Sequence, residues 1–130
     1  MSTDLKYLVF TAILTASLWI PYVVAQVKTN GSLKPQNYID PTQRPLPAWG
    51  KRADRTYINA VETFAPFAAL VIAAHLAGKA DAMTAFWATW FFWVRLAHAA
   101  VYLLGIPYVR TLLFTLGYVA VVGLFWELIK

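Results

Sequence analysis

Four long apolar runs, separated by more polar segments, dominate the pattern of this chain. Each run is close to the roughly 20 residues that a helix needs to cross about 30 Å of hydrocarbon. The pattern therefore predicts an all-α protein, an integral membrane four-helix bundle that forms a single domain over residues 1–130. The expected helices cover about residues 5–27, 51–77, 82–104 and 108–129.

Prolines and glycines mark the ends of these runs. Residues 28–50 are rich in proline and predict an irregular loop. Gly78 follows the second run, and Gly105 with Pro107 follows the third, so short turns are expected at both places. The first run is too long for a signal peptide and lacks a small-residue cleavage pattern, which favours a retained membrane anchor. Pro21 predicts a kink within it.

A polar stripe runs down one face of the second expected helix. At 100° per residue its members fall within an arc of about 80°, so they share one face of an otherwise apolar helix. These members are Arg52, Arg55, Asn59 and Glu62. At a rise of about 1.5 Å per residue, Glu62 lies near the middle of the membrane. An ionised side chain at that depth is costly unless it is paired.

The third expected helix carries a matching stripe, in which Arg95, His98 and Tyr102 recur at i, i+3 and i+7. If the two helices run antiparallel, the residue numbers of any two side chains at the same depth add up to the same total. Three pairs of residues across the two stripes have the same total. These pairs are Glu62 with Arg95, Asn59 with His98, and Arg55 with Tyr102. The register predicts one site between the helices. A structural alternative stays open, in which the buried network only fixes helix register.

The other helix faces are expected to pack or to meet lipid. Phe86, Trp90 and Trp93 project roughly opposite Arg95, so we expect them to face lipid or a neighbouring subunit rather than a ligand. Gly117 and Gly123 in the last helix are expected to be points of close packing, because small residues let membrane helices approach each other.

Composition and charge agree with a membrane protein. The chain has 60% hydrophobic and 13% charged residues and a positive mean hydropathy, which is typical of that class. Its net charge of +5 does not indicate a nucleic-acid partner, because the basic residues are not gathered on a soluble domain. They concentrate instead on one side of the expected bundle, at Lys28, Lys34, Arg44, Lys51, Arg52, Arg55 and Arg110. By the positive-inside rule, the first loop is cytoplasmic and both termini lie on the opposite side.

The polar residues of the two stripes suggest a site that binds an anion, and the chain contains no cysteine. The absence of cysteine excludes disulfides, thiolate metal ligands and a cysteine nucleophile, so any reacting thiol must come from a ligand. We expect no metal site. Arg52, Arg55 and Arg110 outnumber the carboxylates near them, so the cleft should attract an anion such as a peptide with two carboxylates. The apolar helix walls would admit a lipid-soluble second substrate.

These motifs together resemble the MAPEG family, the membrane-associated proteins in eicosanoid and glutathione metabolism, in a bacterial-type member. The resemblance rests on the RxxRxxxNxxE spacing from Arg52 to Glu62, on Arg95-Leu-Ala-His98 followed by Tyr102, and on Pro107 and Arg110. It covers nearly the full length in helix number, loop placement and motif order. It implies a homotrimer that binds glutathione, as cosubstrate, between neighbouring subunits near the cytoplasmic side.

The resemblance also implies individual roles. Arg110 would be the catalytic residue that stabilises the glutathione thiolate, and Arg95 would support Glu62 through an ion pair. The implied glutathione-binding residues are Lys28, Arg52, Arg55, Asn59, Glu62, His98, Tyr102 and Thr111. Some members carry a tyrosine where this chain has Phe114, so a phenol cannot stabilise the sulfur from that position.

The sequence allows three functions. The leading hypothesis is a glutathione-dependent membrane transferase or peroxidase that acts on hydrophobic electrophiles or hydroperoxides. The alternative is a non-enzymatic integral membrane scaffold or accessory subunit, whose polar layer is structural or holds a lipid. A small multidrug exporter is disfavoured, because such exporters place an essential carboxylate in the first helix and the first apolar run here has none.

Overall fold

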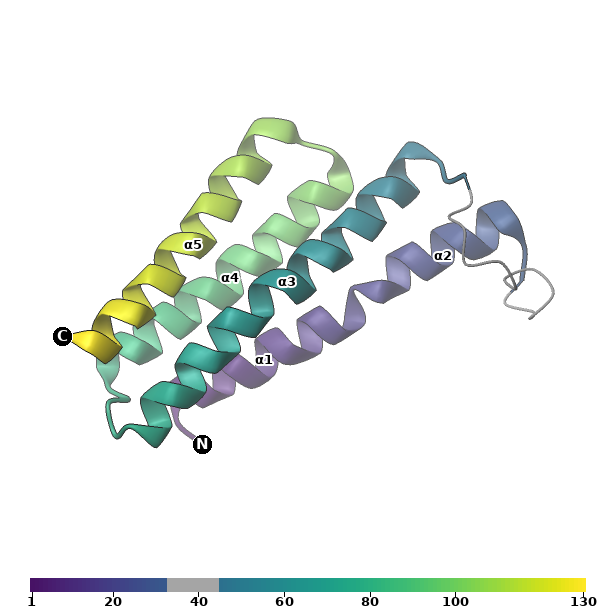
Figure 1. The fold of residues 1–130 in the computed structure, drawn as a ribbon. Helices are drawn as coiled ribbons and strands as arrows, with labels where there is room; N and C mark the ends of the chain where they lie inside the picture. The colour runs from purple at the N-terminus through teal and green to yellow at the C-terminus, as the bar shows by residue number, and fades with distance from the viewer. Residues whose placement is uncertain (33–44) are drawn as a thin grey trace.

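The computed structural model describes residues 1–32 and 45–130, and most of these residues lie in helices (Figure 1). The elements are α1 (Thr3–Ser17), α2 (Trp19–Asn30), α3 (Ala48–Leu76), α4 (Ala82–Leu104) and α5 (Pro107–Ile129). The expected all-α bundle is confirmed. The expected loop over residues 28–50 lies largely outside the described residues. Its described ends are helical, since α2 continues to Asn30 and α3 already begins at Ala48.

The first expected helix is divided in two. α1 ends at Ser17 and α2 begins at Trp19, with Leu18 alone between them. Pro21 explains the division, because proline has no N–H to donate to the carbonyl four residues earlier, and its ring crowds that carbonyl. The carbonyl in question belongs to Ser17, where α1 stops. The expected kink is therefore present as a one-residue break, one turn before the proline.

Three helical stretches are long and apolar enough to cross a membrane: Thr3–Asn30, Ala48–Leu76 and Pro107–Ile129. The fourth expected span, α4, has 23 residues but does not reach the same apolar character. Arg95, His98 and several tryptophans lower its hydropathy. α4 contacts α1, α3 and α5, and this packing buries both Arg95 and His98.

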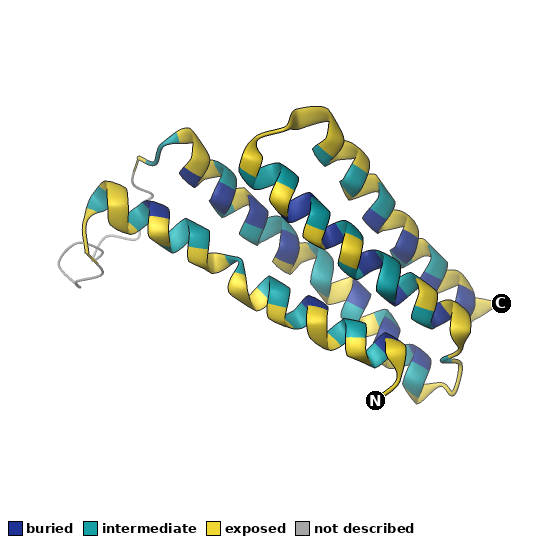
Figure 2. Cartoon of the chain, turned by 180° about the vertical axis from the view of Figure 1, so that it is seen from behind, coloured by how far each residue is buried: buried dark blue, intermediate teal, exposed yellow. Residues whose placement is uncertain are grey.

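The apolar core is formed by residues from the second half of α3, the first half of α4 and the second half of α5. Both chain termini lie at that end of the bundle (Figure 2). At the centre of the core Phe67 of α3 stacks on Phe91 of α4, with ring centroids 4.0 Å apart and an interplanar angle of 11°. The remaining buried members are Val71, Ala88, Ala120 and Leu124. This packing holds α3, α4 and α5 together at one end, and the two polar stripes lie toward the other end.

Trp90 does not face lipid as expected. Its indole nitrogen donates a hydrogen bond of 2.9 Å to the carbonyl of Leu116, so the ring packs between α4 and α5. A tryptophan N–H buried by packing needs such a partner. Phe86 and Trp93, by contrast, are 48% and 55% exposed, as expected for side chains outside the bundle.

The two glycines of α5 differ in how closely α4 approaches them. A Cβ atom on Gly123 would lie 2.3 Å from the ring of Trp87, whereas one on Gly117 would meet Arg95 at an ordinary 3.6 Å. We predict that Gly123→Ala lowers the free energy of unfolding in detergent by roughly 1–3 kcal/mol, the usual cost of overpacking. Gly117→Ala is the matched control and should change it little. Equal effects of the two substitutions would contradict the close approach at Gly123.

Asp4 joins three helices at the end of the bundle that carries the termini. Its carboxylate is buried and lies 2.8 Å from Nε2 of His75, near the end of α3. The Thr84 hydroxyl at the start of α4 donates to the same carboxylate oxygen at 3.3 Å. The other oxygen accepts from the Ser2 hydroxyl at 2.7 Å and from the Leu5 amide at 3.0 Å. The start of α1 is therefore tied to both neighbouring helices.

Candidate functional site

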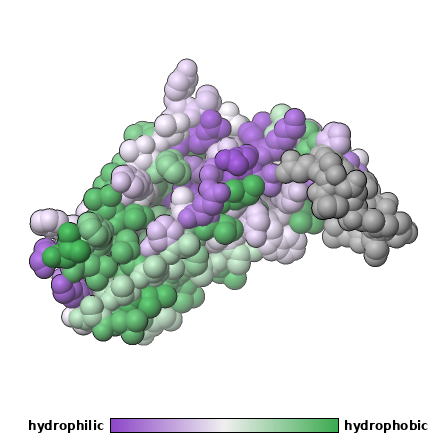
Figure 3. Space-filling model, in the orientation of Figure 1, coloured by the Kyte–Doolittle hydropathy of each residue, from purple (hydrophilic) through white to green (hydrophobic). Residues whose placement is uncertain are grey.

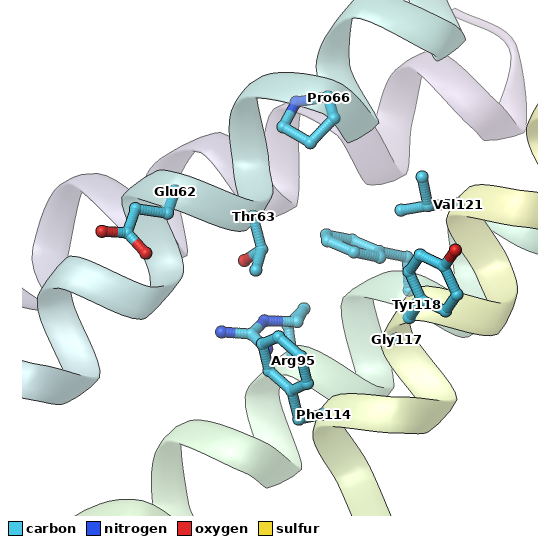
Figure 4. A pocket seen from close by; sticks show the side chains of 9 residues that line it. Glu62, Thr63, Pro66, Arg95, Phe114, Gly117, Tyr118 and Val121 are labelled. Atoms are coloured by element: carbon cyan, nitrogen blue, oxygen red, sulfur yellow. The ribbon is translucent and has the colours of Figure 1, made fainter. Parts of the chain in front are cut away.

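Two cavities that have one lining residue in common lie between α3, α4 and α5. The polar cavity, of about 250 Å³, is lined by Asn59, His98, Tyr102, Arg110, Thr111 and Phe114. The apolar cavity, of about 260 Å³, is lined by Glu62, Thr63, Pro66, Phe91, Arg95, Phe114, Gly117, Tyr118 and Val121 (Figure 4). Phe114 belongs to both linings and so lies where the two cavities meet.

The turn between α4 and α5 brings Tyr102 and Arg110 together. Gly105 has φ +78°, and its amide donates to the Tyr102 carbonyl, while the Ile106 amide donates to the Val101 carbonyl. This pair of bonds is a Schellman motif, in which a glycine takes the left-handed conformation that other residues avoid. Pro107 then starts α5, as proline favours the first helical position. As a result the Arg110 guanidinium carbon lies 4.7 Å from the centre of the Tyr102 ring.

The stripe of α4 faces inward. Arg95 and His98 are only 5% and 1% exposed, and the His98 ring packs edge-on against Tyr102 with centroids 5.6 Å apart. Nδ1 of His98 is buried without a hydrogen-bond partner among the described residues. A buried polar atom without a partner is costly, so this part of the bundle is not a fully satisfied structural network.

Positive charge dominates the two cavities. Arg95 and Arg110 carry it, while Glu62, the one carboxylate among the lining residues, is exposed on α3. Within the part of the chain that the structure describes, no ion pair joins Glu62 to Arg95. In Figure 3 hydrophilic residues gather over the half of the molecule nearer the α4–α5 turn, and the half nearer the termini is largely hydrophobic. The cavities are therefore suited to an anion that carries, or lies beside, an apolar group.

The expected register brings two of the three pairs to common cavities. Asn59 and His98 line the polar cavity together, and Glu62 and Arg95 line the apolar one. Figure 4 shows Glu62 on α3 and Arg95 on α4 at this second cavity. The third pair is not brought together in this way, because Arg55 is exposed and does not line the polar cavity that contains Tyr102.

Three basic residues singled out from the sequence lie away from both linings. Lys28 is exposed near the end of α2, and Arg55 is exposed on α3. Arg52 is half-buried and donates from Nε to the Leu103 carbonyl at 3.3 Å. The catalytic candidate Arg110 and the neighbouring Thr111, in contrast, both line the polar cavity.

Sequence reasoning did not single out Thr63 and Tyr118 as lining residues. Thr63 follows Glu62 in the chain, and its hydroxyl donates to the Asn59 carbonyl at 2.7 Å, which leaves its methyl group as an apolar contact surface. Tyr118 lies one turn after Phe114 on α5. That spacing is the only signal in the sequence, because residues four apart on a helix share a face.

Comparison with known proteins supports one assignment. A family model described as the MAPEG family matches residues 5–130, which is nearly the whole chain. No curated protein and no solved structure matches the chain. The family match agrees with the membrane-spanning helical bundle. The chain therefore belongs to the MAPEG family of membrane proteins of eicosanoid and glutathione metabolism.

Proposed function

We propose that this protein is a glutathione-dependent membrane transferase or peroxidase that acts on hydrophobic electrophiles or hydroperoxides. The observation that carries the proposal is the polar cavity between α3, α4 and α5. Its lining combines a guanidinium, an imidazole, an amide, a phenol and a hydroxyl within a membrane bundle. Such a set suits a peptide that has two carboxylates, an ammonium group and a thiol, and membership of the MAPEG family favours glutathione as that peptide.

Arg110 is proposed to stabilise the thiolate. A free thiol has a pKa near 8.5 and is mostly protonated at neutral pH, although only the thiolate is a good nucleophile. A reduction of two pKa units requires about 2.7 kcal/mol of preferential stabilisation of the anion. Arg110 lies in the first turn of α5, where the guanidinium charge and the positive end of the helix dipole both favour an anion. Thr111 adds a hydroxyl donor beside it.

The apolar cavity is proposed to receive the second substrate. It adjoins the polar cavity at Phe114, so a greasy electrophile bound there would lie close to a sulfur held by Arg110. In a transferase step, the thiolate forms a bond to the electrophilic carbon while that carbon's bond to its leaving group or epoxide oxygen breaks. Phe114 contributes apolar surface to this junction and no hydrogen bond.

The remaining contacts are proposed to arise in a homotrimer. Arg55 and Glu62 are exposed on α3 in the single chain, and so is Lys28 on α2. In this proposal they hold the carboxylates and the ammonium group of glutathione together with a neighbouring copy. The Glu62–Arg95 ion pair forms part of the same arrangement. By the positive-inside rule, the site opens toward the cytoplasm.

A binding experiment tests the proposal. Purified protein in detergent, titrated with glutathione, should bind it and show the ultraviolet absorbance of a thiolate near neutral pH. Asn59→Ala should weaken binding by roughly 10- to 100-fold, the range expected for lost hydrogen bonds to charged groups. Thr89→Ala is the control, because the Thr89 hydroxyl bonds the Ala85 carbonyl of its own helix and Thr89 lines neither cavity.

The same experiment separates the enzyme from its alternative. If intact protein shows no affinity for glutathione, the proposed function is wrong. A non-enzymatic scaffold or accessory subunit whose polar layer is structural, or holds a lipid, would then be favoured. Binding without a thiolate signal would limit the function to a glutathione-binding protein.

A further inference from the structure

The turn that carries Arg110 into the site has little packing of its own. Leu104 is 73% exposed and Tyr108 is 89% exposed, so the apolar side chains on either side of the turn point away from the bundle. The Schellman bonds of Gly105 and Ile106 close the end of α4, but they lie within the turn itself. Some contact from another helix is needed to fix the turn against the rest of the protein.

Arg52 of α3 supplies that contact. Its Nε donates to the Leu103 carbonyl at 3.3 Å, one of the last carbonyls of α4, which have no partner within their own helix. The side chain also lies against Gly105, where a Cβ atom would come within 3.1 Å of the Arg52 Nε. Among the residues that the structure describes, Arg52 is the only one outside α4 and α5 that hydrogen-bonds to residues 103–107.

The chemistry of this contact suits a clamp. A cation at the C-terminal end of a helix is stabilised by the negative end of the helix dipole. A guanidinium is planar and offers several N–H groups in a fixed arrangement, so it can hold a backbone carbonyl in one geometry. The side chain thus binds the end of α4 through both charge and shape, while Gly105 leaves the space that the guanidinium occupies.

We propose that Arg52 is a positioning residue that clamps the α4–α5 turn and thereby holds Arg110 over Tyr102. The clamp itself rests on the geometry of Arg52, Leu103 and Gly105. Its consequence for chemistry rests on the proposed function, since Arg110 is the residue that the clamp positions. Arg52 and Arg55 therefore differ in role although they lie one turn apart on α3.

Hydrogen exchange in the ligand-free protein tests the clamp without reference to glutathione. R52Q should increase the exchange rates of the Gly105 and Ile106 amides by about tenfold or more, because local opening of the turn becomes easier. R55Q removes the same charge from an exposed position of the same helix and should leave both rates unchanged. R52K should give intermediate rates, since lysine keeps the charge but not the planar donor group.

A second measurement follows the chemistry. With glutathione bound, R52Q should move the thiolate titration to higher pH by roughly one unit and lower kcat on the order of 10- to 100-fold, while KM for glutathione changes little. R52K should recover part of the shift. If R52Q only destabilised the fold, the protein that remains folded and binds glutathione would still show the wild-type thiolate titration.

These measurements test the Arg52 clamp separately from the proposed function. Wild-type exchange rates at Gly105 and Ile106 in both R52Q and R52K would overturn the clamp. If R52Q does not fold, R52K alone carries this test, and faster exchange in it supports the clamp. If intact wild-type protein binds no glutathione, the proposed function fails, and the exchange rates still decide whether Arg52 holds the turn.

Discussion

Arg110→Ala should abolish the thiolate absorbance of bound glutathione at neutral pH and reduce turnover by about 10²- to 10³-fold, the usual cost of losing one preorganised stabilising group. The side chain lines the polar cavity from the first turn of α5, where it lies over the Tyr102 ring. Without it the thiol pKa should return toward its free value near 8.5. Activity of the variant should therefore rise as the pH is raised through that value.

The control variant for this prediction keeps the positive charge at position 110. Arg110→Lys should retain part of the thiolate signal, because an ammonium group stabilises the anion but lacks the planar guanidinium. Binding affinity for S-methylglutathione, which has no ionisable thiol, should be nearly the same in wild type and in Arg110→Ala. If the thiolate titration of Arg110→Ala matches that of wild type, Arg110 is not the residue that activates the sulfur.

Asp4→Ala should lower the free energy of unfolding in detergent by about 2–3 kcal/mol. The substitution removes a buried carboxylate and leaves the Thr84 hydroxyl and the His75 imidazole without their shared partner. We place the effect below that of a fully buried ion pair, because the His75 side chain is 29% exposed. Chemical denaturation in mixed micelles would measure it. Lys6→Ala, an exposed change two residues after Asp4 on α1, should stay within about 0.5 kcal/mol of wild type.

A double-mutant cycle gives this prediction a sharper form. The effects of Asp4→Ala and His75→Ala on the free energy of unfolding should be non-additive by about 1–2 kcal/mol, because Nε2 of His75 and the Asp4 carboxylate are only 2.8 Å apart. Strict additivity would show that the two side chains do not interact in solution. Glutathione binding should be affected little in either variant that folds, because Asp4 and His75 lie at the other end of the bundle from the polar cavity.

Periodicity predicted which polar side chains share a face on each helix. The stripes on α3 and α4 share faces because side chains three or four residues apart lie together on any helix. The antiparallel register follows from a short turn between the two helices, and it correctly places Asn59 with His98 and Glu62 with Arg95 at common cavities. Gly123 was also recognisable as a close-packing point, because small residues permit helix approach in membranes.

Residues whose partners come from distant helices were not predictable in the same way. Trp90 was expected to face lipid on the basis of its angle from Arg95, but α5 covers it and supplies the Leu116 carbonyl. Arg52 shares a face with Asn59, yet its long side chain reaches the end of α4 instead of the cavity. A helical wheel gives the direction of a Cα–Cβ bond, and it does not say which neighbour lies there or how far a flexible side chain extends.

The amino-acid sequence by itself determined the helical class, the membrane-spanning character of three of the four expected spans, the outer ends of those four segments to within a few residues, and the side chains that share a face. These properties depend on local spacing and on apolar length, which a single chain segment carries. Only the tertiary structure decided that Asn59, Glu62 and the α4 stripe line two cavities with Phe114 in common, that Arg52 bonds the Leu103 carbonyl at the end of α4, and that Asp4 ties α1 to His75. Those contacts depend on how whole helices rotate and pack against one another, because packing of the complete bundle selects one arrangement among many that the same local patterns allow.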